Sequence, residues 1–516
     1  MTPGWMSESP RPFSKVLVAN RGEIAVRVLQ AAREAGLAGV AVHSQGDSSS
    51  LHVEVADEAV LLEGEGLEGT YLDAVAIIEA ARKSGADAIH PGYGFLSERA
   101  DFARRVEEAG IRWIGPPADA IETMGDKISA RSLMIQSGVP VIPGEQIPVE
   151  EGADHLGALA SAAAKVGYPL LIKASAGGGG KGMRAVSEPK NLRTEFEAAA
   201  REASAAFGDG TVYIEKLLTR ARHVEIQVLC DSLGGAIHLN ERDCSLQRRY
   251  QKVIEEAPSP ALTPAIREAM GEAAVTAARS VSYVGAGTVE FLLASNGQFY
   301  FLEMNTRIQV EHPVTEMTTG VDLVQKQFEV AAGLPLGILQ TEVTQSGHSI
   351  EARVYAEDPD SGFLPSTGTL AVWRPPSGPG VRVDSGVREG DEVTIDYDPM
   401  LAKLIVHAPS RDAAIRRLDT ALSDFVALGV RTNIAFLRHS LAHESFLGGE
   451  VDTDFLDSTD PSELYGEEPD GPMLVSIAAA ARRLGLDRAA ATAAEQADDH
   501  TGHHGDPFRT LGRTFP

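Results

Sequence analysis

The residues of this sequence best suited to chemistry lie between Gly285 and Pro313, on a predicted β-hairpin. Two apolar runs flank Asn296-Gly297, the strongest short signal for a hairpin turn. A two-residue turn there places Glu290 directly opposite Glu303, and Asn305 follows on the same strand face. Opposed carboxylates destabilise a strand pair. A hard cation with oxygen ligands would relieve this repulsion, so the pattern predicts a metal site.

The same alternation continues through Arg307, Gln309 and Glu311, which predicts that these side chains share the face of the glutamates. The alternative interpretation is a solvated face of an ordinary antiparallel sheet. The flanking residues are too apolar for a wet surface, so we favour a binding site.

A glycine run at 177–180 lies in the segment ASAGGGGKGMR. It follows Lys173 at the end of a predicted strand and precedes Lys181 and Arg184. Four glycines also suit a flexible linker. Exposed backbone N–H groups beside cations suit a phosphate chain, so we favour phosphate binding. The loop is not of the Walker A type, because Lys181 is followed by Gly182 rather than by serine or threonine.

A basic cluster within an acidic protein lies between Glu241 and Lys252. Surface ion pairs are one explanation for it, and an anion site is the other; we favour the anion site. Just upstream, His223–Val228 alternates polar and apolar residues, as a half-buried strand does.

The elements that must position these residues begin with a βαβ pattern: strands at 15–19 and 39–43 and a helix at 23–36. Further helices at 71–84 and 100–110 and strands at 87–91 and 111–114 predict a doubly wound parallel sheet to about residue 120. The first βα turn is ANRGEIA, so the dinucleotide fingerprint GxGxxG is absent.

Beyond residue 120 the pattern changes. A helix is predicted at 128–137, and a smaller unit over 150–217 has helices at 156–166 and 191–207 and strands at 168–173 and 212–215. A further mixed unit is expected over 349–450, with a strand at 351–355 and a helix at 411–428. Residues 455–472 read as an exposed linker, 472–496 as an alanine-rich helix, and the histidine-containing tail as disordered.

The composition limits the class of function. A chain of 516 residues with 43% hydrophobic residues can bury a large core. A net charge of −27 argues against nucleic acid and against anionic membranes as partners. Cys230 and Cys244 lack CxxC spacing and are expected to be free thiols. No apolar run approaches the roughly 18 residues of a membrane span, and no signal peptide is recognisable, so we predict a cytoplasmic protein.

An ordered set of motifs gives the chain a resemblance to a known family. The motifs are ANRGEIA at 19–25, HPGYGFLSE at 90–98, MGDK at 124–127, KASAGGGGKGMR at 173–184, RDCSLQRRYQKVIEEAP at 242–258 and EMNTRIQVEHPVTE at 303–316. From about Ser14 to Phe455 the sequence resembles the biotin carboxylases, ATP-grasp enzymes that carboxylate protein-bound biotin.

The resemblance implies an α/β and α+β chain with an ATP-grasp fold. The implied domains are a Rossmann-like domain at 14–125, an ATP-grasp domain at 126–332 with a mobile lid at about 145–217, and a mixed C-terminal domain at 346–455. Residues 456–516 would be an acidic linker, short helices and a disordered tail.

The resemblance also implies roles for individual residues. The nucleotide would contact Lys127, Lys173, Gly179, Gly180, Glu215, Lys216, Leu217, Leu218, His223, Gln247, Tyr250 and Leu292. Two Mg²⁺ or Mn²⁺ ions would bind Glu290, Glu303 and Asn305, and bicarbonate would bind among Lys252, Arg307, Gln309, Val310 and Glu311. Arg353 would hold the ureido oxygen of biotin. Tyr250 departs from the family, whose best-known members have histidine there.

The implied reaction activates bicarbonate with ATP as carboxyphosphate, which breaks down to carbon dioxide and phosphate. Glu311 would be the base that accepts the bicarbonate proton, kept ionised by the nearby Arg307. The phosphate would then deprotonate biotin N1, and Arg353 would stabilise the enolate oxygen that results.

The implied partners are a biotin carboxyl carrier protein or domain, a carboxyltransferase subunit and a second copy of the chain. No methionine-flanked lysine of the carrier type is present, so the biotinyl lysine is expected elsewhere. The alternatives are another ATP-grasp ligase, such as a carbamoyl-phosphate synthase, and a non-catalytic nucleotide-binding regulatory subunit.

Overall fold

A computed structural model describes residues 12–147, 155–174, 184–207 and 212–465. The predicted loop glycines Gly179 and Gly180, the predicted helix at 472–496 and the tail lie outside the described residues. No helix among the described residues is long and apolar enough to cross a membrane.

The first unit is the predicted parallel sheet, which has the strand order β3-β2-β1-β4-β5. Its interior strands are apolar and buried under the flanking helices, as a parallel sheet covered on both faces requires. Its strands are β1 Lys15–Val18, β2 Ala38–His43, β3 Glu58–Leu61, β4 Ala88–His90 and β5 Arg112–Trp113. Its helices are α1 Gly22–Glu34, α2 Leu51–Val55, α3 Ala74–Ser84, α4 Ala100–Glu108 and α5 Ala118–Gly125.

Two elements of this unit were not predicted. Helix α2 has only five residues, and β3 is an edge strand whose side chains are mostly exposed. Neither therefore carries the apolar periodicity on which a prediction from sequence depends.

The centre of the molecule is an eight-stranded antiparallel sheet with the order β14-β13-β10-β11-β12-β15-β22-β20. Its strands are β10 Arg222–Cys230, β11 Ala236–Arg248, β12 Gln251–Ala257, β13 Gly285–Leu293, β14 Phe299–Asn305, β15 His348–Tyr355, β20 Val381–Ser385 and β22 Met400–Ala408. The sheet continues without interruption across the expected boundary between the second and third domains.

One face of this sheet is closed by helices. The apolar residues of β10 and β13 pack against helix α9, Pro264–Ser280, through side chains such as Met270 and Ala274. Helices α10 His312–Thr319 and α11 Leu323–Ala331 lead from the predicted bicarbonate segment back to the first unit. Because strand residues alternate, the polar residues of β10 and β13 must lie on the opposite face.

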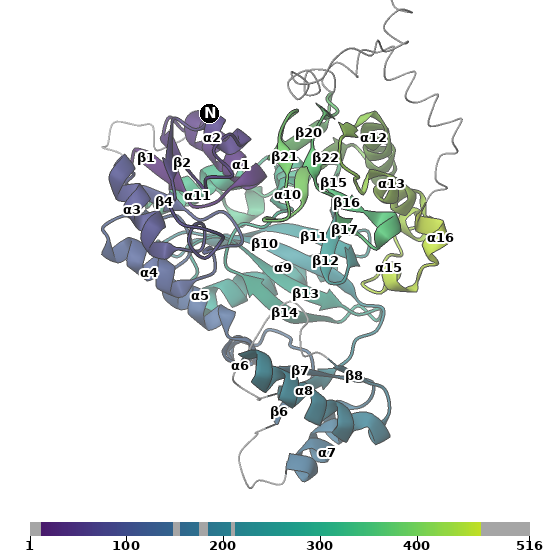
Figure 1. The fold of residues 1–516 in the computed structure, drawn as a ribbon. Coiled ribbons are helices and arrows are strands. Elements are labelled where there is room, and N and C mark those ends of the chain that lie inside the picture. The colour runs from purple at the N-terminus through teal and green to yellow at the C-terminus, as the bar shows by residue number, and fades with distance from the viewer. Residues whose placement is uncertain (1–11, 148–154, 175–183, 208–211, 466–516) are drawn as a thin grey trace, which may run out of the picture.

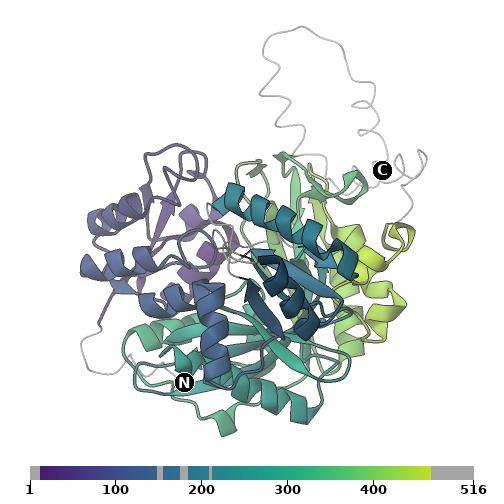
Figure 2. The same cartoon turned by 90° about the horizontal axis from the view of Figure 1, so that it is seen from below.

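A smaller antiparallel sheet, β6-β9-β7-β8, lies at one end of the molecule. Figure 2 shows this unit in front of the central sheet, as a lid would lie. It consists of α6 Lys127–Gln136 leading into β6 Gly144–Ile147, α7 His155–Val166, β7 Leu170–Ala174, β8 Arg184–Val186, α8 Leu192–Phe207 and β9 Val212–Lys216. The predicted helices and strands of this segment are confirmed, with small shifts at their ends.

The C-terminal part packs helices on the far strands of the central sheet. The predicted helix at 411–428 is too long: α12 ends at Asp424, and Val426–Leu428 forms strand β23, because Trp373 and its neighbours pair with it. The other elements here are β16 Glu357–Asp358, β17 Leu364–Pro365, β18 Gly368–Thr369, β19 Val372–Arg374, β21 Glu392–Val393, α13 Ile434–Ala442, α14 Glu444–Leu447, α15 Phe455–Ser458 and α16 Pro461–Leu464.

Candidate active site

A row of charged residues crosses four neighbouring strands on the polar face of the central sheet. Glu303 of β14 pairs with Glu290 of β13, Glu290 pairs with Glu225 of β10, and Glu225 pairs with Arg242 of β11. The row follows from the alternation of β10 and β13, whose other face is needed for the apolar contact with α9. Three adjacent carboxylates in a row require cations, which are supplied from other strands.

The predicted pairing of Glu290 with Glu303 is confirmed, but the predicted two-residue turn is wrong. Ala294 N–H donates to the carbonyl of Gln298, so the loop has three residues and ends at Gly297, whose φ is +82°. This turn shifts the register by one residue. A bulge between Phe301 and Glu303 shifts it back.

Lys252 is the cation that holds the carboxylates together. Its Nζ donates to Glu225 at 2.5 Å, to Glu290 at 2.8 Å and to Glu311 at 2.6 Å. Burial alone would lower the pKa of Lys252, but these carboxylates raise it well above its usual value. The lysine is therefore charged and fixes three side chains that come from three different elements.

Glu311 also contacts Arg353, whose guanidinium donates to Glu311 Oε2 at 2.9 Å and to Glu255 at 2.6 Å. Burial would raise the pKa of Glu311, but Lys252 and Arg353 outweigh it, so the pKa is lowered. Glu311 is consequently an ionised carboxylate in a buried position.

Arg307 has a different partner from the one expected. It does not hydrogen-bond to Glu311; it donates to Glu98 at 2.9 Å and to Asn305 at 2.8 Å. The strand alternation that predicted its position ends with β14 at Asn305, and residues 306–311 form bends and a turn. The cations that keep Glu311 ionised are Lys252 and Arg353, which belong to distant strands.

Two lysines, Lys127 and Lys173, lie at the end of the cleft where the nucleotide is predicted to bind. Lys127 begins α6, and Lys173 of β7 forms an ion pair with Glu215 of β9. His223 Nε2 lies 3.0 Å from Glu290 Oε2, and Glu290 raises the pKa of this histidine against the effect of burial. These groups lie between the lid and the central sheet.

A single cleft of about 630 Å³ contains all of the predicted site residues that the structure describes. They are Lys127, Lys173, Glu215, Lys216, Leu217, Leu218, His223, Gln247, Tyr250, Lys252, Glu290, Leu292, Glu303, Asn305, Arg307, Gln309, Val310, Glu311 and Arg353.

The carboxylates of the hairpin fit a divalent cation. Glu303 opens on the cleft, and no hydrogen bond or ion pair from a described residue reaches its carboxylate. Desolvation by the surrounding protein and the negative charge of the nearby Glu290 raise the pKa of Glu303. A bound cation would lower this pKa again. The amide nitrogen of Asn305 donates to Glu290 at 2.9 Å, and its oxygen accepts from Arg307 at 2.8 Å. The donor set is composed of oxygens, as Mg²⁺ requires.

For the basic cluster at 241–252, some residues fit the predicted anion site and others fit the alternative of structural ion pairs. Arg242 and Lys252 point inward to the carboxylates, whereas Arg248 binds Glu357 and stacks on Phe363 at 3.5 Å, a structural contact. Arg249 and Tyr250 form the β11–β12 turn with positive φ angles of 49° and 66°. The turn directs Tyr250 to the edge of the cleft.

The sequence alone did not single out Glu225, Arg242 or Glu255. Glu225 lies in the alternating strand 223–228 and shares a strand face with His223 and Gln227, so the alternation itself was a usable signal. Arg242 and Glu255 carried no such signal, because their contacts include residues far along the chain, Thr288 for Arg242 and Arg353 for Glu255.

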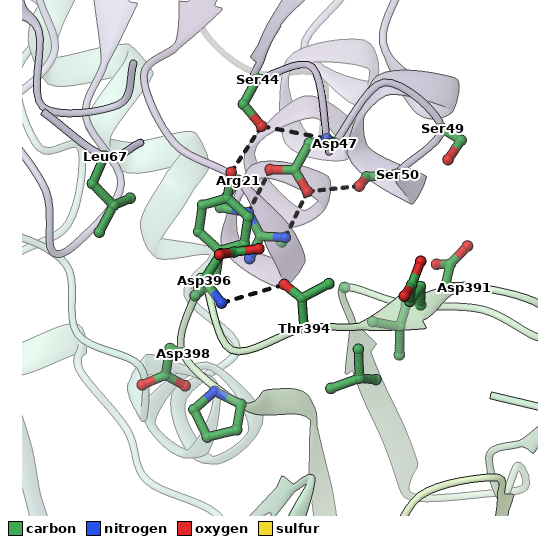
Figure 3. A pocket seen from close by; sticks show the side chains of 18 of the residues that line it. Arg21, Ser44, Asp47, Ser49, Ser50, Leu67, Asp391, Thr394, Asp396 and Asp398 are labelled. Carbon is green, nitrogen blue, oxygen red and sulfur yellow. Dashed lines mark hydrogen bonds and ion pairs between the residues drawn. The ribbon is translucent and has the colours of Figure 1, made fainter. Parts of the chain in front are cut away.

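A second hollow, of about 740 Å³, lies between the first unit and the loop 391–401 (Figure 3). Within it Asp47 receives both a bidentate pair from Arg21 at 2.7 Å and a hydrogen bond from Ser50 at 2.9 Å. Asp398 lines both this hollow and the cleft, so the two adjoin near Arg353. No predicted site residue that the structure describes lines this second hollow.

Solved structures of the same fold establish the class of protein. The biotin carboxylase domain dimer of a 2-oxoglutarate carboxylase from Hydrogenobacter thermophilus, solved with MgADP, ADP and bicarbonate, aligns with a TM-score of 0.84 at 45% identity. It covers 89% of this chain and 100% of that one. Biotin carboxylase from Campylobacter jejuni aligns with a TM-score of 0.82 at 42% identity, covering 87% and 99%. The chain therefore has the ATP-grasp fold of this class.

Sequence comparisons then give the family. Residues 12–121 match the biotin carboxylase N-terminal domain, 126–339 the ATP-binding domain of the carbamoyl-phosphate synthase L chain, and 351–458 the biotin carboxylase C-terminal domain. Biotin carboxylase 1 of Bacillus subtilis is 51% identical over 449 residues, which are 87% of this chain and 99% of that protein. The chain belongs to the biotin carboxylase family.

Longer relatives are equally similar. The alpha subunit of mitochondrial methylcrotonoyl-CoA carboxylase from Dictyostelium discoideum is 52% identical over 448 residues, which are 86% of this chain and 63% of that protein. The chain thus spans less than two thirds of the length of this relative.

Proposed function

We propose that this chain uses ATP to carboxylate N1 of biotin with bicarbonate, as the first half-reaction of an acyl-CoA carboxylase. The observation that supports this most strongly is the cluster around Lys252. One partly buried lysine joins Glu290 at the predicted metal site to Glu311 at the predicted bicarbonate site, with Arg353 beside them. A site for phosphoryl transfer and a site for bicarbonate are thereby coupled in one cleft.

In this proposal Glu311 is the base. Its ionised carboxylate accepts the proton of bicarbonate while the bicarbonate oxygen attacks the γ-phosphorus of ATP, which releases ADP and forms carboxyphosphate. Its lowered pKa keeps it unprotonated at neutral pH. Lys252, Arg307, Gln309 and Val310 would hold the bicarbonate.

The charge of the transferred phosphoryl group would be offset by Lys127 and Lys173. Glu290, Glu303 and Asn305 would hold the divalent cations, whose chemistry is to neutralise the phosphate oxygens. Lys173 must exchange its ion pair with Glu215 for a phosphate contact, so nucleotide binding and a rearrangement of β7 and β9 are expected together.

Arg353 would bind the ureido oxygen of biotin when phosphate removes the N1 proton. A guanidinium already aimed into the cleft stabilises the developing negative charge without reorganisation. Carboxyphosphate hydrolyses in water, so the lid, which we place at about 145–217, would exclude it.

The carrier protein, the carboxyltransferase, the homodimer and a cytoplasmic location are further parts of the proposal. Relatives that are carboxylase alpha subunits support the carrier and the carboxyltransferase, and a neighbour solved as a domain dimer supports the homodimer. We also propose the domain limits 14–125, 126–332 and 346–455. The other ATP-grasp ligases are less well supported, because both flanking domains match biotin carboxylase models.

The test is fixation of labelled bicarbonate by the purified chain with ATP, Mg²⁺ and free biotin. We expect carboxybiotin and ADP to form only when all components are present. ATP consumption with ammonia or an amino acid in place of biotin would instead identify another ligase. ATP binding without any turnover would identify a regulatory subunit.

A further inference from the structure

Arg242 is the largest fully buried side chain in the described part of the protein. It lies on β11, directly beneath the cleft, and does not line it. Its guanidinium has five N–H donors, and each has a side-chain acceptor. The acceptors are Glu225, Gln227 at 2.7 Å, Thr315 at 3.0 Å, Thr288 at 3.0 Å and Gln309 at 2.7 Å.

The contact with Gln309 fixes the orientation of an amide in the cleft. Arg242 can only donate, so it must face the oxygen of Gln309. The amide nitrogen of Gln309 then points into the cleft and donates to Glu290 Oε1 at 2.8 Å. Without Arg242 the amide could rotate and present its oxygen to Glu290, which would repel it.

The contact with Glu225 fixes the position of Lys252 in the same way. Arg242 Nε binds Glu225 Oε1, which leaves Oε2 of that carboxylate for Lys252 at 2.5 Å. Glu225 thereby holds Lys252 at the point from which it also contacts Glu290 and Glu311. A single guanidinium plane therefore supports both polar groups.

We propose that Arg242 is a positioning residue that sets the orientation of Gln309 and the place of Lys252 at the bicarbonate end of the cleft. The proposal rests on the function proposed above, because it names bicarbonate as the ligand. It does not involve the nucleotide end, since none of the five acceptors of Arg242 lies on the lid.

A purely structural role would have a different signature. Removing the buried Arg242 leaves Glu225 with Lys252 as its remaining cation and lowers the stability of the whole fold. Such a loss of stability would change the KM for bicarbonate and the KM for ATP by similar factors. A positioning role affects the KM for bicarbonate and leaves the KM for ATP unchanged.

The first variant is Arg242→Lys, which keeps the charge but cannot satisfy five acceptors that lie in a plane. We expect the KM for bicarbonate to rise about 10- to 100-fold, as misplacement of binding groups does, with the KM for ATP within about twofold. The matched control is Arg267→Lys. Arg267 also lies against β11, where it makes a bidentate ion pair with Glu241 at distances of 2.7 and 2.8 Å. Neither residue lines the cleft.

A milder variant covers the case in which Arg242→Lys does not fold. Thr288→Val keeps the shape of the side chain, removes one hydrogen bond to Arg242, and does not line the cleft. We expect a rise of about fivefold in the KM for bicarbonate, the value of one hydrogen bond. Equal rises for bicarbonate and ATP, or no change in either, would overturn the positioning role.

A double variant tests the route through Gln309. If Arg242 acts through this amide, Gln309→Ala and Arg242→Lys together should raise the KM for bicarbonate by less than the product of the single effects. Full multiplicativity would contradict that route. Failure of the proposed function is distinguishable, because the unmodified chain would then fix no bicarbonate on biotin.

Discussion

Glu311 shows how a buried carboxylate is kept ionised. It is only 2% exposed, yet Lys252 and Arg353 approach it from two sides and lower its pKa. A base in this state is available over the whole neutral range, and its strength is limited by the same cations. The sequence predicted Glu311 as the base and Arg307, the nearest arginine in the chain, as its cationic partner, whereas the structure places Lys252 and Arg353 beside it.

Glu311→Gln should therefore reduce biotin carboxylation about 10²- to 10⁴-fold, since the amide cannot accept the proton of bicarbonate. ATP affinity should stay near normal, because Glu311 lies away from the lysines of the nucleotide end. Steady-state carboxylation and nucleotide titration measure the two effects. Equal turnover in both proteins would remove Glu311 as the base.

His90 is a second residue whose protonation matters, here for stability. Its Nδ1 accepts from Gly92 N–H at 2.9 Å and its Nε2 lies 3.1 Å from Gln327 Oε1, an arrangement that suits the neutral ring. Burial lowers the pKa of His90 to about 4 from 6.5. The unfolded chain thus binds the proton more readily than the folded one.

The stability that His90 contributes is complete above pH 6.5 and is lost as the pH falls towards 4. At pH 5 the loss should be about 2 kcal/mol. Urea unfolding of the parent protein and of His90→Asn at pH 7 and pH 5 measures it. If the stability difference between the two proteins did not change with pH, the titration of His90 would not be responsible.

At the scale of elements, the β13–β14 hairpin shows what local rules can give. The signal at Asn296-Gly297 correctly placed a turn, and the alternation correctly placed Glu290 against Glu303. The three-residue loop and the bulge near residue 302 were not predicted. Each shifts the strand register by one residue, and the two shifts are in opposite directions. A bulge has no sequence signature here, because Leu302 continues the apolar run.

The loop depends on Gly297, whose φ of +82° suits glycine. Gly297→Ala should lower the free energy of unfolding by roughly 1–2 kcal/mol, the cost of a left-handed conformation for a residue with a Cβ. Carboxylation per folded molecule should not change, because Gly297 does not line the cleft. Chemical denaturation and activity assays measure the two quantities. Ser295→Ala, at an exposed position of the same loop with a normal φ, is the control and should be nearly neutral.

At the scale of the whole molecule, Lys403 joins parts of the chain that are far apart in sequence. It is fully buried on β22, lies 3.2 Å from Glu23 of α1, and donates to the carbonyl of Val310 at 2.8 Å. The first unit, the predicted bicarbonate segment and the C-terminal strands therefore meet at one ammonium group. Lys403 thus links the folding of these three parts.

Lys403→Met should lower the free energy of unfolding by about 3–5 kcal/mol, because Glu23 is left buried without its cation. Glu23→Gln in the same protein should recover part of this loss, which a double-mutant cycle measures. Lys15→Met is a suitable comparison, because its pair with Glu58 is partly exposed and should be worth at most about 1 kcal/mol. If the two lysine variants were equally stable, the buried contact would not be the cause.

The sequence by itself predicted the residues that line the candidate cleft. The strand alternation of 223–228 and 289–305 puts polar side chains on one face because the other face must be apolar, and this rule acts within a few residues. The ordered motifs supplied the family and the remaining positions, all of which, where described, line one cleft.

Only the tertiary structure decided which charges pair. Glu311 meets Arg353 of β15 and Lys252 of β12, and Arg242 meets five acceptors from four other segments. These contacts depend on the strand order of the central sheet and on the bulge in β14. Strand order is set by packing between distant segments, and no local pattern of residues contains it.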